Sequence, residues 1–233
     1  MLTVATWNVL HRVHAENWRD AADDWPEEPR RIAGIAALVA ARPEEVIALQ
    51  EVSGDQLAAL RAALPGRSVH VLRYPRIPRL RRGRAELSDV AEHLVVVADA
   101  SSRLVRAESF DNDPGNGALA VQVGALLVIA THVTGDRRRT EQLAQLTKFA
   151  DSSPVVLLGD FNTDRETVLS ALGAEFAAAE LPPGSPPTRP RRSGSKSQVI
   201  DHIVARGANV GPATVLPTPA WSDHNLLSAP LRF

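Results

Sequence analysis

The chain has 233 residues, of which 44% are hydrophobic and 23% are charged, a composition typical of a globular protein with one or two domains. Cysteine is absent, which excludes disulfides and thiolate metal sites, so any bound metal would be a hard cation held by carboxylate, amide or imidazole groups. The formal net charge of −1 conceals separate acidic and basic segments.

The N-terminal segment alternates as a strand does, and it lacks the basic start and cleavage site of a signal peptide. No apolar run reaches the length of a membrane span. We therefore expect a cytoplasmic protein with no membrane partner. Nothing in the sequence indicates an obligate protein partner.

The first half of the chain alternates between strands and helices. Pro29 suits a first helical turn, and Ser53 with Gln56 has the form of a capping box. The pattern predicts a strand over 2–10, a loop or short helical insertion over 11–28, a helix after Pro29, a strand over 46–49, a helix over 53–64 and an exposed loop over 73–84.

The second half begins with a run of strands. Thr163 with Glu166 forms a second potential capping box, and the segment 181–197 is rich in Pro, Gly, Ser and Arg. The pattern predicts strands over 93–98, 103–110, 117–123, 125–131, 155–158, 198–205 and 226–231, with helices over 138–150 and 163–172. This mixture favours sheets with helices on their outer faces.

Polar side chains recur at the ends of separate predicted strands. Each has an ordinary alternative: a turn or cap for Asn8, a buried core imidazole for His132, a helix N-terminal acid for Asp160. Their common position is the informative feature, because strand ends are where α/β enzymes place their chemistry. The set comprises Asn8, Glu51, His132, Asp160, Asn162, Asp201, Asp223 and His224.

These groups suit the hydrolysis of a phosphoester. A hard cation held by carboxylate and amide oxygens offsets phosphate charge and lowers the pKa of water. A positioned carboxylate takes a proton from the nucleophile, and an imidazole paired with a second carboxylate donates to a phosphoryl oxygen.

The motifs around these residues resemble the endonuclease/exonuclease/phosphatase superfamily, in the family order and over nearly the whole chain. They are Thr6-Trp7-Asn8-Val9, Leu49-Gln50-Glu51-Val52, Thr131-His132-Val133, Gly159-Asp160-Phe161-Asn162, Ile200-Asp201-His202-Ile203 and Ser222-Asp223-His224. The resemblance implies an α/β (α+β) four-layer sandwich, two face-to-face mixed β-sheets flanked by helices, formed by residues 1–233 as one domain.

The resemblance also implies roles. Asn8 and Glu51 would bind Mg²⁺ (Mn²⁺ is possible), with Asp223 assisting the metal or orienting its neighbour. Asp160 and Asn162 would orient or deprotonate water and hold the phosphate. Two imidazoles would face the phosphate: His224, supported by Asp201, and His132, for which Glu92 is the candidate support; an exposed residue before a strand is the alternative for Glu92.

Four departures from the family's subgroups keep the subfamily open. Ser53 stands where DNase I-like enzymes carry an arginine, and Leu10 stands where abasic endonucleases carry an acidic residue. The disulfides of secreted DNase I and the extended signature of the phosphoinositide 5-phosphatases are absent as well.

Basic segments bear on the substrate. Six arginines lie between Arg73 and Arg84, with Tyr74 as the one aromatic residue, so base stacking there is poorly supported. In the loop before Asp201, Arg189 and Lys196 are candidates for substrate binding. For both segments the alternative is a solvated basic loop.

We therefore expect a Mg²⁺-dependent phosphodiesterase, most simply a nuclease acting by in-line attack of water. The alternatives are a phosphatase or phosphodiesterase for a small phosphorylated metabolite or nucleotide and, less favoured, a non-catalytic binding module.

Overall fold

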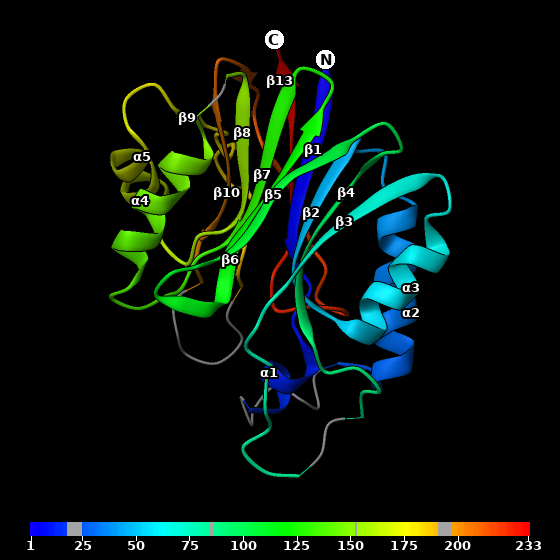
Figure 1. The fold of residues 1–233 in the computed structure, drawn as a ribbon. Coiled ribbons are helices and arrows are strands. Elements are labelled where there is room, and N and C mark those ends of the chain that lie inside the picture. Colours follow the sequence, from blue (N-terminus) through cyan, green and yellow to red (C-terminus); the bar gives the residue numbers. More distant parts are fainter. Residues whose placement is uncertain (18–24, 84–85, 152, 191–196) are drawn as a thin grey trace.

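Two β-sheets pack face to face, and helices cover the outer face of each sheet (Figure 1). This arrangement comes from a computed structural model that describes residues 1–17, 25–83, 86–151, 153–190 and 197–233. It confirms the expected four-layer sandwich. No helix in these ranges is long and apolar enough to cross a membrane.

The first sheet has seven strands in the order β11-β13-β1-β2-β4-β3, with β12 also paired to β13. Strands β1 and β2 are parallel, and the other pairs are antiparallel. The strands are β1 (Leu2–Asn8), β2 (Val46–Ser53), β3 (Arg67–Arg73), β4 (Glu92–Asp99), β11 (Asn209–Val210), β12 (Thr214–Leu216) and β13 (Leu226–Arg232).

The second sheet has six strands in the order β5-β6-β7-β8-β10-β9. Here β7 and β8 are parallel, and the other pairs are antiparallel. The strands are β5 (Arg103–Phe110), β6 (Asp113–Val123), β7 (Leu126–His132), β8 (Val155–Asp160), β9 (Ala177–Ala178) and β10 (Asp201–Arg206).

Helices pack on each outer face because successive strand residues point to opposite sides of a sheet. Val96 and Leu158 face the other sheet, whereas Leu49 and Leu157 face the helices. Central strands therefore read as continuous apolar runs. The helices are α2 (Glu28–Ala40) and α3 (Gly54–Ala63) beside the first sheet, α4 (Arg139–Phe149) and α5 (Arg165–Leu172) beside the second, and α1 (Arg12–Asn17) at one end of the sandwich.

The two predicted capping boxes have different outcomes. Ser53 accepts a hydrogen bond from the Gln56 backbone N–H, and the Gln56 side chain accepts one from the Ser53 backbone N–H, so the first box is confirmed. The second is wrong. Asp164 caps α5 by accepting from the Thr167 N–H, because a carboxylate one residue later already satisfies the exposed donors of the first turn.

Some strand boundaries also differ from the sequence pattern. Strand β2 continues to Ser53 through a register shift between Leu49 and Val52, and β3 was not among the predicted strands. Strand β3 lies at the edge of its sheet and is half-buried over most of its length, so its apolar signal is weak. Both chain termini lie at one end of the sandwich, and α1 lies at the other (Figure 1).

Candidate active site

Three candidate residues lie in one row across the second sheet. His132 in β7 is the direct neighbour of Asp160 in β8, and Asp160 is the direct neighbour of Asp201 in β10. Cross-strand partners have their side chains on the same face of a sheet. Strand register therefore gathers residues that are 28 and 41 positions apart in sequence.

The first sheet meets this row through Asn8, at the end of β1. Its Nδ2 donates to Glu51 Oε1 at 2.9 Å and to Asp160 Oδ2 at 3.2 Å. Its Oδ1 accepts from the Leu10 N–H at 3.0 Å. One buried amide thus joins two carboxylates from opposite sheets.

Residues with a strained backbone lie around the place where the two sheets meet at Asn8. Leu10, Glu51 and Asn162 are the non-glycine residues with positive φ in the described ranges, at 56°, 58° and 51°. Residues with side chains seldom adopt this conformation, and it persists where the surroundings impose it. In Glu51 it accompanies the register shift of β2, which turns the carboxylate toward Asn8.

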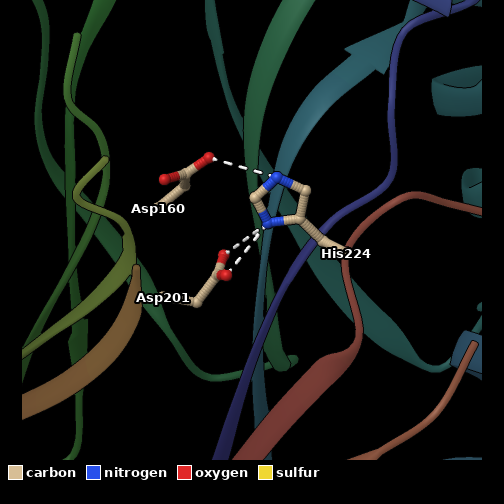
Figure 2. A group of neighbouring side chains, drawn as sticks. All are labelled: Asp160, Asp201 and His224. Carbon is tan, nitrogen blue, oxygen red and sulfur yellow. Dashed lines mark hydrogen bonds and ion pairs between the residues drawn. The ribbon is translucent and has the colours of Figure 1, made fainter. Parts of the chain in front are cut away.

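His224 forms a buried pair with Asp201 (Figure 2). The Nδ1 of His224 lies 2.9 Å and 3.1 Å from the two carboxylate oxygens of Asp201. Its Nε2 lies 3.7 Å from Asp160 Oδ2. The backbone is fixed as well: the His224 carbonyl accepts from Trp7 Nε1, and its N–H donates to Ser222 Oγ.

The charges around His224 favour its protonated form. Burial alone would lower the pKa of this imidazole, but the negative charges of Asp201, Asp160 and Asp223 outweigh burial and raise it to about 9. His224 is therefore an imidazolium at neutral pH. Its Nε2–H points toward Asp160, while Asp201 holds the ring by Nδ1.

The pKa values of the two carboxylates that contact Asn8, Asp160 and Glu51, are shifted in opposite directions. Burial and the charge of Asp201 raise the pKa of Asp160. Burial would also raise the pKa of Glu51, but the charges of His14 and His132 and the Asn8 hydrogen bond hold it far below the usual range. Asp160 is thus the carboxylate more ready to accept a proton, and Glu51 is the permanent anion.

His132 completes the row as a second imidazole. Its Nε2 lies 3.7 Å from Asp160 Oδ2 and 4.0 Å from Glu51 Oε1. Its Nδ1 is buried and has no hydrogen-bond partner among the described residues. The expected support by Glu92 is therefore not observed.

Glu92 instead pairs with His14, a residue outside the predicted set. Its Oε2 lies 3.2 Å from His14 Nε2, and Glu92 is buried rather than exposed. Helix α1 carries His14 to Glu92, the first residue of β4. Although burial opposes it, the charge of Glu51 and the bond to Glu92 raise the pKa of His14 to about 9. The sequence signal was present as His11 and His14, three residues apart directly after a motif.

Asn162 has a fixed side chain and a fixed backbone. Its Nδ2 donates to the Val133 carbonyl at 2.9 Å, its N–H donates to Asp160 Oδ1 at 2.8 Å, and its carbonyl accepts from Arg139 at 2.9 Å. Its Oδ1 remains near Gly135. Phe161, between the two polar residues, points into the core, as expected from strand alternation.

Asp223 and Arg189 form an ion pair at the edge of the site. Arg189 donates to Asp223 Oδ2 from Nε at 3.1 Å and from a terminal nitrogen at 2.9 Å. The carboxylate expected to assist a metal and the arginine expected to bind substrate are thus in contact with each other. Lys196 lies outside the described residues.

The donor set fits a hard cation. Glu51 and Asp160 are carboxylates from different sheets, and both contact the same amide nitrogen of Asn8. Asn8 itself would coordinate only after its amide turns over, because its Oδ1 faces Leu10. A further set of possible ligand atoms, within 4.8 Å of one another, belongs to Asp160, Asp201 and His224. There the Asp201–His224 hydrogen bond competes with a metal.

Comparison with known proteins is consistent with this geometry. A model of the "Endonuclease/Exonuclease/phosphatase family" matches residues 5–224. No curated protein matches the sequence.

Solved structures give a similar result for the fold, with this chain covered completely in each comparison below. A mannosyl-6-phosphatase from Bacteroides thetaiotaomicron has 18% identity, 100% coverage of its own chain and a TM-score of 0.70. TDP2 from D. rerio, complexed with a single-strand DNA product, has 14% identity, 99% coverage and a TM-score of 0.72. Truncated TDP2 from Caenorhabditis elegans has 14% identity, 98% coverage and a TM-score of 0.67. At these identities the likeness concerns the fold.

Proposed function

The chain belongs to the endonuclease/exonuclease/phosphatase family, and we propose that it hydrolyses phosphodiester bonds in nucleic acid with the help of a divalent metal, Mg²⁺ or Mn²⁺. The observation that carries this proposal is the convergence of two sheets on one Asn8 amide, beside the Asp201–His224 pair. A binding module would not need a charged, strained and buried constellation of this kind.

The metal would be held by Glu51, with Asp160 facing it and Asn8 joining after rotation of its amide. When bound, a hard divalent cation supplies charge that offsets the phosphate and favours ionisation of water. The choice of Mg²⁺ rests on the oxygen-rich donor set and on the absence of cysteine.

Asp160 is proposed as the group that takes the proton from the attacking water. Its raised pKa brings it closer to a working pH than an ordinary aspartate, which favours proton transfer. The Asn162 N–H holds Oδ1, so Oδ2 is the oxygen that faces Asn8 and the imidazoles. Asn162 is proposed to orient this water through its Oδ1, since its Nδ2 is bound to the Val133 carbonyl.

His224 is proposed to stabilise the developing charge on a phosphoryl oxygen. It is already cationic, and Asp201 fixes its tautomer and its orientation, so its Nε2–H needs no reorganisation during the reaction. From β7, His132 Nε2, which lies 3.7 Å from Asp160 Oδ2, would provide a second contact to the phosphate. Asp223 would act indirectly, by holding Arg189 at the edge of the site.

A phosphatase acting on a small phosphorylated metabolite is the second candidate. It is supported by the structural likeness to a protein named as a mannosyl-6-phosphatase, over the whole of both chains. The two candidates share the hydrolytic groups and differ in what surrounds the scissile phosphate.

The test is a substrate panel with Mg²⁺: plasmid DNA, single-stranded DNA, RNA, sugar phosphates and nucleotides. Cleavage of a polynucleotide that disappears with EDTA and in Asp160→Asn supports the proposal. Turnover of small phosphoesters without cleavage of any polynucleotide would replace it by the second candidate. Turnover of no phosphoester would refute both.

A further inference from the structure

The segment 75–83 between β3 and β4 carries exposed arginines that the hydrolytic site does not use. We call residues 75–83 the arginine arm. The side chains of Arg79, Arg81 and Arg82 are exposed, and they make no hydrogen bond or ion pair with any residue in the described ranges. Most other arginines near the site are paired, as Arg189 is with Asp223 and Arg138 with Asp136.

The arm is held in place by its backbone and by its first arginine. The Arg76 N–H donates to the Pro114 carbonyl at 3.1 Å, and its guanidinium lies 3.2 Å from Asp113 Oδ1. The two prolines of the arm restrict φ at positions 75 and 78. A fixed loop loses less entropy on binding a ligand than a mobile loop does.

The middle of the arm is attached to α1. Asn17 Nδ2 donates to the Arg79 carbonyl at 3.0 Å, and Asn17 Oδ1 accepts from the Arg81 N–H at 2.8 Å. The Asn17 side chain therefore binds the backbone on both sides of Leu80. The guanidinium groups remain free of these contacts.

Helix α1 connects the arm to the proposed hydrolytic centre. The His11 N–H, just before α1, donates to Glu51 Oε2 at 3.1 Å, and His14 pairs with Glu92. Asn17 is six positions after His11, which corresponds to a rise of about 9 Å along a helix. Figure 1 shows α1 and the connection from β3 to β4 at the same end of the molecule, opposite the termini.

The separation of the arginine arm from the hydrolytic centre by α1, together with the positive charge of the arm, suits a ligand with several phosphates. A single phosphate at Asp160 and His224 would leave the arm without a partner, whereas a polynucleotide strand extending along α1 would present further phosphates to it. The arm offers no aromatic surface, because residues 75–83 include no aromatic residue and Tyr74 is buried. Contacts would therefore be made to the backbone rather than by base stacking.

From this geometry we infer that the arginine arm binds the phosphate backbone of a polynucleotide, without sequence preference, a few nucleotides from the bond that is cut. This inference rests on the proposed function and adds where on the molecule the polynucleotide substrate would bind. It assigns substrate contacts to Arg79, Arg81 and Arg82, and it assigns to Asn17 the role of positioning the arm.

The test is the salt dependence of binding, measured by fluorescence anisotropy with a labelled single-stranded DNA oligonucleotide in EDTA, where hydrolysis does not interfere. Replacing Arg79, Arg81 and Arg82 together by alanine should reduce the slope of log Kd against log salt concentration by about 2, because each phosphate contact on a single strand contributes about 0.7. Oligonucleotides of different sequence should give the same change.

The control is the double variant Arg103→Ala and Arg232→Ala, which removes two arginines elsewhere on the surface. Both residues are exposed and lie in strands β5 and β13, at ends remote from α1. This control should retain the wild-type slope. A second readout, hydrolysis of bis(p-nitrophenyl) phosphate, should be unchanged in the triple variant, because that substrate is too small to reach the arm.

The outcomes separate this inference from the proposed function. If the wild-type protein hydrolyses the small diester but does not bind the oligonucleotide, or binds it with the same slope in the triple variant, the arm has no such role while the proposed chemistry stands. Equal losses in the triple and control variants would show a general charge effect and would also overturn the inference. If no phosphodiester is hydrolysed, the proposed function itself fails.

Discussion

Asp160 and Asp201 lie directly opposite each other on the antiparallel strands β8 and β10, and their surroundings shift their pKa values in opposite directions. Burial affects both carboxyl groups. In Asp201 the charge and hydrogen bond of His224 outweigh burial and lower the pKa, whereas Asp160 also meets the charge of Asp201, and its pKa rises. Two neighbouring aspartates can thus have different roles: a permanent anion and a proton acceptor.

The first prediction concerns pH. Because the folded-state pKa of His224 is raised to about 9, its stabilisation by Asp201 is complete below the unfolded pKa of about 6.5 and is lost as the pH rises through about 9. Activity that needs the imidazolium should decline over the same alkaline range. Asp201→Asn removes the anion and should move this decline to lower pH. An alkaline limb that does not move, measured from kcat/KM against pH, would contradict the role of His224.

The second prediction concerns the hydrolytic groups themselves. Removing His224 or Asp160 by substitution with alanine should lower kcat by at least about 100-fold, on the scale of a general acid or base. His70→Ala is the control, because His70 lies in β3 and bonds to Ser102. Steady-state kinetics on a phosphodiester substrate, with circular dichroism to verify folding, measures the effect. Full activity in His224→Ala would refute the assignment.

The third prediction concerns the amide that joins the sheets. Asn8→Asp replaces a donor with an anion beside Glu51 and Asp160, so three carboxylates then meet without the Nδ2 hydrogen bonds. We expect a lower melting temperature in EDTA and a larger rise on addition of Mg²⁺ than in the wild type, because a cation offsets the added charge. Thermal unfolding with and without metal measures both. Asn209→Asp, on exposed β11, should show neither change.

The fourth prediction concerns the approach of β7 to β8. A Cβ added at Gly159 would lie 1.9 Å from the Thr131 carbonyl oxygen, a backbone atom that cannot move aside without disturbing the ladder. Gly159→Ala should therefore lower the free energy of unfolding by about 3 kcal/mol or more. Gly66→Ala, where no atom lies within 4 Å of the added Cβ, is the control. Urea unfolding of both variants gives the comparison, and equal stabilities would show that the strands separate easily.

The fifth prediction concerns the start of α5. Asp164→Ala should cost about 1 kcal/mol of stability, because it removes the acceptor for the Thr167 N–H. Glu166→Ala should change stability by less than about 0.5 kcal/mol, because Glu166 is exposed and makes no cap. The reverse ranking in urea unfolding would restore the capping box that the sequence pattern suggested at Thr163.

Much of the architecture was predictable because its causes are local. Apolar runs such as 155–158 contain no polar residue, so they require burial on both faces of the strand. The Ser53–Gln56 capping box depends on residues only three positions apart. The motifs predicted the family, which the match over residues 5–224 confirms. The edge strand β3 was missed because it is only half-buried over most of its length, so its apolar signal is weak.

The partners of the side chains depended on the tertiary structure. The sequence by itself determined that Asn8 and Asp160 end strands and that His224 comes shortly before one, whereas Glu51 lies inside β2, at its register shift. The register of β7, β8 and β10 aligned His132, Asp160 and Asp201. The position of α1 made His14, rather than His132, the partner of Glu92. Likewise Asp223 meets Arg189 across 34 residues. Strand ends follow from local hydrophobic pattern, whereas partners follow from how distant strands and loops align, which local pattern does not encode.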